Sequence, residues 1–122
     1  VVLLSTSWVN DCHYCMAAHT AIAKGAKVED DVIEAAREGR AQSDPKLEAL
    51  RQFALQLVRE RGWVDGAPLQ AFFDAGFTKQ HVLDLITILA QKTISNYVNH
   101  IAETPVDRGF QPFAWQEEGA NA

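Results

Sequence analysis

The strongest constraint on the fold is a helical spacing of apolar residues that recurs along the chain. Asp44 and Pro45 suit the cap and the first position of a helix, and apolar residues then follow at three- and four-residue intervals as far as Gly62. This spacing places them on one face of a helix, where they can pack against a neighbour. No segment alternates apolar and polar residues as a half-buried strand would. The sequence therefore predicts an all-α fold.

Capping residues and glycines divide the chain into about six predicted helices. They are expected over residues 1–8, 11–24, 29–38, 44–62, 67–75 and 78–103. Between Val82 and Leu89 the last and longest of them is apolar on nearly every side. That pattern predicts a long C-terminal helix buried at the centre of the domain or against another subunit.

The predicted domain covers residues 1–107, and residues 108–122 form a C-terminal tail. The tail carries Phe110, Phe113 and Trp115, which would be an association liability if all were exposed. We expect these aromatic side chains to pack on the domain itself or on a neighbouring subunit.

Composition limits the classes of function. The chain has 122 residues, of which 48% are hydrophobic and 22% charged, as expected for one globular domain. A net charge of −5 without a basic cluster argues against a nucleic-acid partner, and no apolar run is long enough to predict a membrane partner. The chain starts at Val1 inside an apolar run, so we expect residues upstream of it. A single closely spaced cysteine pair suits a reducing cytoplasm.

Cys12, Cys15 and His19 carry the main chemical signal, a C-x-x-C-x-x-x-H motif inside a predicted helix. Helical spacing places all three side chains on one stripe, with His19 one turn beyond Cys15. Two thiols one turn apart can form a disulfide, and a histidine can exchange a proton with a thiol. The motif predicts a dithiol redox site with its own base, which needs no cofactor. No nucleotide-binding glycine motif occurs in the sequence.

The start of this helix favours a thiolate. Asn10 and Asp11 are candidate N-caps, so Cys12 and Cys15 would lie in the first turn, where free N–H groups and the helix dipole stabilise an anion. Cys15 is nearer to His19, which favours it as the attacking thiolate with Cys12 resolving the sulfenic acid. The reverse assignment stays open, because Cys12 is nearer the helix start.

Four further residues are candidate supporting groups. His13 and Tyr14 lie between the two cysteines, as a second donor and a lid. Asn99 and His100 would reach the site if the long helix packs against it.

Three other interpretations of the motif remain. The cysteines could be small core residues. Cys12, Cys15 and His19 could bind zinc, with His100 or a water as fourth ligand. The chain could also be a non-catalytic helical oligomer whose dithiol is vestigial or a redox sensor.

The motif also carries a family resemblance. The stretch from Asn10 to His19, N-D-C-H-Y-C-M-A-A-H, resembles the signature of alkylhydroperoxidase AhpD-like proteins in the carboxymuconolactone decarboxylase superfamily. The segments A-I-A-K-G-A from Ala21 and V-I-E-A from Val32 resemble that family's next turn and helix. N-Y-V-N-H-I from Asn96 and T-P-V-D from Thr104 are similar to the end of the long helix in its peroxidase-related members.

The resemblance implies an all-α domain that forms homo-oligomers, commonly trimers or hexamers, with a dimer as an alternative. It implies a thiol-dependent peroxidase or disulfide oxidoreductase, an antioxidant enzyme in which Cys12 and Cys15 are the redox-active pair and His19 belongs to a proton relay. The substrate would be a small peroxide, and an external dithiol or thiol protein would restore the thiols. The relay's glutamate would precede Val1. Decarboxylase activity is the alternative in the same superfamily, but its decarboxylases lack the cysteine pair.

Overall fold

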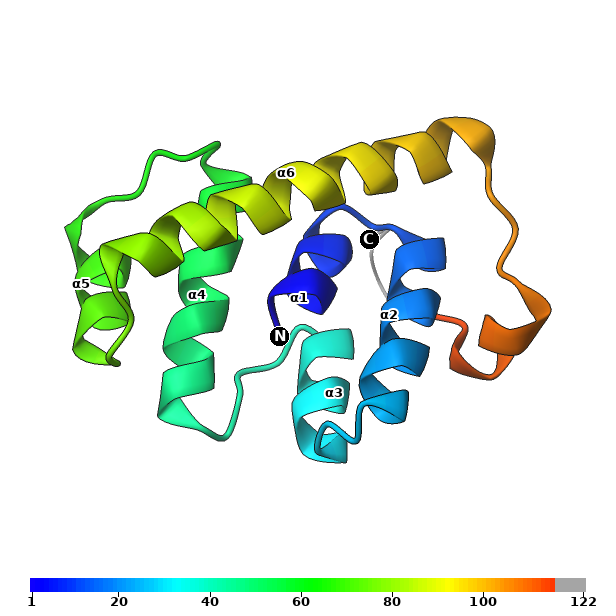
Figure 1. Ribbon diagram of the computed structural model, residues 1–122, viewed down its shortest axis with the longest axis horizontal. Coiled ribbons are helices and arrows are strands. Elements are labelled where there is room, and N and C mark those ends of the chain that lie inside the picture. The colour runs from blue at the N-terminus through cyan, green and yellow to red at the C-terminus, as the bar shows by residue number, and fades with distance from the viewer. Residues whose placement is uncertain (116–122) are drawn as a thin grey trace.

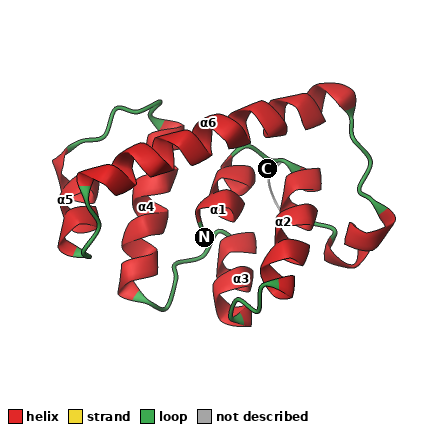
Figure 2. Ribbon diagram, viewed as in Figure 1, coloured by secondary structure: helices red, strands yellow, loops and turns green. Residues whose placement is uncertain are grey.

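The computed structural model describes residues 1–115, and these fold into helices joined by short turns, without a strand (Figures 1 and 2). The elements of this part of the chain are listed in order as α1 (Val2–Val9), α2 (His13–Gly25), α3 (Asp30–Arg37), α4 (Pro45–Arg59), α5 (Gly66–Asp74), α6 (Lys79–Ala102) and the short 3₁₀ helix η1 (Arg108–Phe113). The all-α prediction is confirmed. None of the described helices is long and apolar enough to cross a membrane.

Local capping chemistry sets the boundaries of α4 and α6. Asp44 accepts the N–H of Lys46 at 2.8 Å, with Pro45 in the first position, as the sequence predicts. At the start of α6 the Thr78 hydroxyl accepts the backbone N–H of His81, and the His81 ring accepts the backbone N–H of Thr78. His81 is therefore a capping residue far from the cysteines along the chain.

The central helix is α1. It contacts α2, α3, α4 and α6 (Figure 1), and even its hydroxyl side chains Ser5, Thr6 and Ser7 are buried. On one side its Val2 joins a core cluster with stacked aromatic rings, in which the centroids of Phe53 and Phe72 lie 4.4 Å apart. On the other side its Leu4 joins a second cluster, whose buried residues are Leu4, Met16, Ile33, Ala36 and Trp115.

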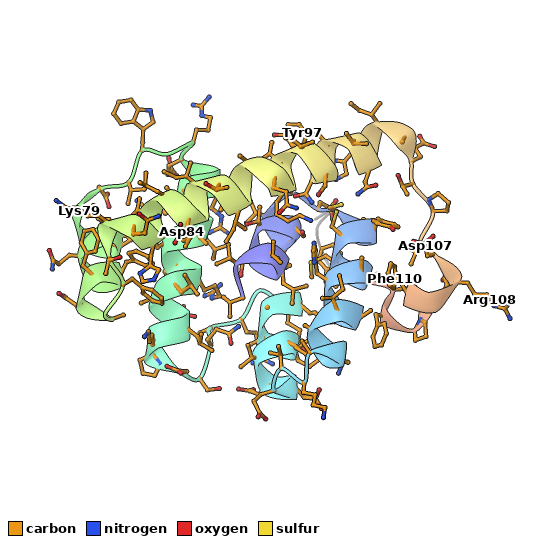
Figure 3. All side chains as sticks on the ribbon, in the orientation of Figure 1. Lys79, Asp84, Tyr97, Asp107, Arg108 and Phe110 are labelled. Carbon is orange, nitrogen blue, oxygen red and sulfur yellow. The ribbon has the colours of Figure 1, made fainter. Side chains whose placement is uncertain are left out.

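The predicted all-round burial of the last helix is wrong for this chain taken alone. Leu85 of α6 is buried, but Leu83 is 60% exposed and Ile86 is 48% exposed. The exposed apolar residues continue along the same helix as Ile94, Tyr97, Val98 and Ile101, and Figure 3 shows Tyr97 projecting from the side of α6 away from α1. The six residues form a row that we call the apolar stripe of α6. A sequence pattern alone does not distinguish a helix covered within its own chain from one left with an uncovered apolar face.

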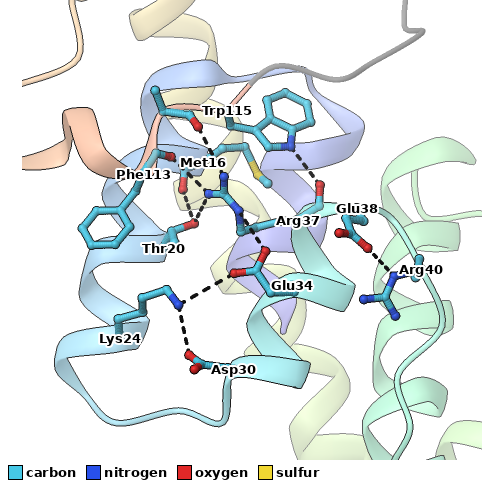
Figure 4. A network of polar contacts seen from close by, with 11 residues as sticks. Met16, Thr20, Lys24, Asp30, Glu34, Arg37, Glu38, Arg40, Phe113 and Trp115 are labelled. Atoms are coloured by element: carbon cyan, nitrogen blue, oxygen red, sulfur yellow. Dashed lines mark hydrogen bonds and ion pairs between the residues drawn. The ribbon is translucent and has the colours of Figure 1, made fainter.

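Residues 107–115 form a C-terminal strap that lies against α2 and α3. Arg37 of α3 donates to the Thr20 hydroxyl at 2.8 Å and to the carbonyls of Phe113 and Ala114 at 3.1 and 3.3 Å (Figure 4). The indole N–H of Trp115 donates back to the Arg37 carbonyl at 2.8 Å. Phe110 and Trp115 thus pack on the chain's own helices, while residues 116–122 of the predicted tail lie outside the described residues.

Candidate dithiol site

A tight turn between α1 and α2 presents the first cysteine. Asp11 has a left-handed backbone with φ of 53°, a conformation that Asp tolerates better than most residues. The next residue, Cys12, returns to an extended conformation and is itself the N-cap of α2, its sulfur accepting the N–H of Cys15 at 3.4 Å. The prediction that Asn10 or Asp11 caps this helix is therefore wrong, because the left-handed residue is used to reverse the chain.

Both cysteines are free thiols at the contact between α2 and α6. Cys12 is 1% exposed and Cys15 is 2% exposed. The sulfur of Cys15 accepts a hydrogen bond from the Asn99 amide of α6 at 3.3 Å, and the Ser95 hydroxyl lies 3.9 Å away. The predicted contact between Asn99 and the dithiol is present.

These surroundings separate the acidities of the two thiols. A hydrogen bond from the Cys12 thiol lowers the pKa of Cys15 to about 5, and the amides of Asn99 and Asn96 and the positive charge of Lys92 contribute in the same direction. Burial opposes this shift but does not reverse it. The pKa of Cys12 is raised, first by its hydrogen bond with Cys15 and then by burial. These surroundings favour ionisation at Cys15 rather than at Cys12.

His19 meets a lysine rather than a sulfur. Its Nε2 atom lies 2.6 Å from the ammonium of Lys92 on α6. Lys92 is only 5% exposed. Burial lowers the pKa of His19 to about 4, and the charge of Lys92 adds to the shift. The ring is therefore neutral near pH 7, and Nε2 accepts a hydrogen bond from the ammonium. Within residues 1–115 no hydrogen bond joins His19 to either cysteine.

The two residues between the cysteines face the C-terminal strap. His13 donates from Nδ1 to the Trp115 carbonyl at 2.8 Å, and its Nε2 lies 3.3 Å from Asp11. Tyr14 donates its hydroxyl to Asp107 at 2.6 Å, a bond that raises the pKa of the tyrosine. Figure 3 shows Asp107 and Phe110 beside α2, at the end of the chain segment that descends from α6. The structure thus places both predicted supporting residues in contacts with the strap.

A cavity of about 200 Å³ leads to the first cysteine. The cavity is lined by Asp11, Cys12, His13, Tyr14, Asn99, His100, Glu103 and Thr104. His100 belongs to this lining, as predicted for a long helix that packs against the site, and its ring stacks on Tyr97. Asn99 lines the cavity and also bonds the Cys15 sulfur, so it connects the open space with the buried thiolate.

Comparison with known proteins agrees with this geometry. The sequence model of the carboxymuconolactone decarboxylase family matches residues 1–60, which include the whole cysteine motif. The fold matches the crystal structure of the alkylhydroperoxidase AhpD core, an uncharacterized peroxidase-related protein from Ralstonia eutropha JMP134, with a TM-score of 0.76 and 28% identity over 89% of this chain. The chain is therefore AhpD-like in its fold, and its first half carries the sequence pattern of the carboxymuconolactone decarboxylase family.

This AhpD-like chain spans 59% of the length of that Ralstonia protein. No protein of curated function matches its sequence.

Sequence reasoning missed three residues of the AhpD-like site, Lys92, Ser95 and Asn96. With Asn99 they occupy one face of α6, spaced by three, four and seven residues from Lys92, and we call them the polar row of α6. Asn96 is fully buried and ties the α1–α2 turn to α6, accepting from Asn10 at 2.9 Å and donating to Ser7 at 3.5 Å. Because α6 carries many other polar residues, its sequence alone does not single out this row.

The zinc interpretation finds little support in this AhpD-like site. Among residues 1–115 no three His, Cys, Asp or Glu side chains are placed to hold a metal ion. The His19 nitrogen that a metal would use already accepts from a positively charged ammonium. A cation at that position would repel a second one.

Proposed function

We propose that this protein is a thiol-dependent peroxidase that reduces a small peroxide with Cys15 and Cys12. The observation that carries the proposal is the environment of the Cys15 sulfur, which accepts hydrogen bonds from Asn99 and the Cys12 thiol and has no carboxylate partner within residues 1–115. A thiolate is the nucleophilic form of cysteine, so a site that stabilises one is suited to attack an O–O bond.

The proposed reaction has two steps. The Cys15 thiolate attacks one peroxide oxygen, the O–O bond breaks, and the leaving alkoxide takes a proton to become an alcohol, leaving Cys15 as a sulfenic acid. The Cys12 thiol then attacks that sulfur, and water leaves as the Cys12–Cys15 disulfide forms. An external dithiol or thiol protein returns both cysteines to thiols by exchange, as a reducing compartment such as the cytoplasm would allow. The Lys92 ammonium and the His19 ring, which are hydrogen-bonded to each other, are candidates for supplying the proton to the leaving alkoxide.

Burial favours a small substrate. Both sulfurs are almost fully covered, and the cavity beside Cys12 holds only about 200 Å³. A small peroxide fits such a space, and an external thiol would approach the disulfide through Cys12, which lines the cavity. The peroxidase-related description of the Ralstonia protein points in the same direction.

One equivalent of cumene hydroperoxide is expected to remove both free thiols of the reduced, metal-free protein. Mass spectrometry after alkylation counts the thiols, and dithiothreitol should restore both. Protein treated with cumene alcohol in place of the peroxide is the control. Thiols that survive peroxide in the folded, reduced protein would rule out the peroxidase function.

We also propose that the protein assembles with copies of itself through the apolar stripe of α6. Six large apolar side chains are exposed along this one helix, and a row of that length on a free surface would favour association. The family resemblance implies homo-oligomers of the same kind.

Replacing Ile94, which is 67% exposed, with glutamate is expected to reduce the assembly to smaller species, because each contact would then bury an unpaired charge. Size-exclusion chromatography with light scattering measures the mass. Ile22→Glu makes the same change at a 58% exposed position of α2 and is expected to leave the mass unchanged. Equal masses for wild type and Ile94→Glu would exclude the stripe as the interface.

A further inference from the structure

Lys92 is a buried ammonium without an acidic partner in the described part of the chain. It is 5% exposed, and none of the ion pairs formed within residues 1–115 includes it. A buried charge is costly unless an opposite charge or hydrogen bonds compensate it. Its one hydrogen-bond partner is His19, which is neutral and compensates only by accepting.

The packing of α2 against α6 shows where the opposite charge can lie. Ser95 and Asn99 of α6 face the sulfur of Cys15, and one turn earlier on the same face Lys92 meets His19. On α2, His19 is one turn beyond Cys15. The two contacts are therefore successive steps along one helix–helix interface, and the ammonium lies beside the thiolate within the same buried layer.

We propose that Lys92 is a positioning residue of the dithiol site, whose hydrogen bond fixes the His19 ring while its positive charge adds to the hydrogen bonds that favour an anionic Cys15 sulfur. The charge of Lys92 acts on both groups in the required direction, towards an ionised Cys15 and a neutral His19. The other titratable groups that influence the sulfur or His19 are Cys12 and Tyr14, which interact with Cys15, and the α-amino group of Val1, which acts on His19. None of these side chains is a carboxylate, so no other described group offsets the lysine.

This inference deepens the proposed function but can be measured without peroxide. The readout is the pH at which iodoacetamide alkylation of Cys15 reaches half its maximal rate, since only the thiolate reacts. Lys92→Met, which keeps an unbranched chain without the charge, is expected to raise this midpoint by up to about one pH unit, at most a tenfold loss of thiolate at low pH. The His19 pKa, followed by NMR, is expected to rise towards its ordinary value.

Matched variants separate charge from packing. Lys79→Met makes the same change at an exposed position of α6 and is expected to leave the midpoint unchanged. Lys92→Arg retains a positive charge and is expected to keep the midpoint nearer to wild type than Lys92→Met. Because Lys92→Met removes an unpaired buried charge, its thermal midpoint is expected to equal or exceed that of the wild type.

The inference is overturned if folded Lys92→Met alkylates with the wild-type midpoint, or if the wild-type midpoint itself lies near that of a free cysteine. If Lys92→Met does not fold, Lys92→Gln provides the same test with a polar, neutral side chain. A shifted midpoint in a protein that does not consume peroxide supports the role of Lys92 and rejects the proposed function. The two failures are therefore distinguishable.

Discussion

Replacing Cys15 by serine is expected to lower the rate of peroxide consumption by at least about 30-fold. Serine lacks an acidic thiol, and burial keeps the pKa of the remaining Cys12 at or above that of a free cysteine, so about 3% or less of it is ionised near neutral pH. The variant should still fold, because a hydroxyl can accept the Asn99 amide in place of the sulfur. The measurement is the initial rate of cumene hydroperoxide loss with dithiothreitol as reductant.

Cys12→Ser should behave differently, which makes it the matched comparison. A serine hydroxyl can donate to the Cys15 sulfur as the Cys12 thiol does, so Cys15 stays acidic and reacts once. Without a resolving thiol the product is a sulfenic acid, which dimedone would trap and mass spectrometry would detect. A sulfenic acid on Cys12 in the Cys15→Ser protein would reverse the assignment of attacking and resolving cysteines.

Arg37→Met is expected to destabilise the fold by about 3 kcal/mol. The guanidinium makes three hydrogen bonds that join α2, α3 and the strap, and its side chain is only 16% exposed. Without it, the carbonyls of Phe113 and Ala114 lose their charged donor, and Trp115 loses the strap geometry that holds it over the second core cluster (Figure 4). Urea unfolding followed by circular dichroism gives the free energy.

The control for this variant is Arg40→Met. Arg40 forms an exposed ion pair with Glu38, and such pairs contribute about 1 kcal/mol or less. If the two arginine variants are equally stable, then the hydrogen bonds of Arg37 do not hold the strap in solution.

The sequence identified features that depend on neighbouring residues along the chain. Asp44 and Thr78 cap their helices through bonds to residues two or three positions away, so short patterns are enough to find them. The C-x-x-C motif also lies within one turn of helix. The contact of Asn99 with the site follows once the long helix is assumed to pack there.

Features created by packing could not be found in this way. The burial of Lys92 depends on α2 lying against α6, and nothing near it in sequence distinguishes it from an exposed lysine. The same limit applies to Arg37, whose partners Phe113 and Ala114 are more than seventy residues away. The exposure of the apolar stripe depends on which elements cover α6, which residue spacing does not specify.

The residues at the start of α2 contact two different parts of the protein, the strap and α6. The sulfurs of Cys12 and Cys15 lie within the protein towards α6, whereas the intervening His13 and Tyr14 bond to the strap. The two outer residues of the four-residue motif therefore carry the chemistry, and the two inner residues hold the strap. Substitutions at His13 and Tyr14, or at their strap partners Asp107 and Trp115, would therefore remove no described hydrogen bond to the Cys15 sulfur.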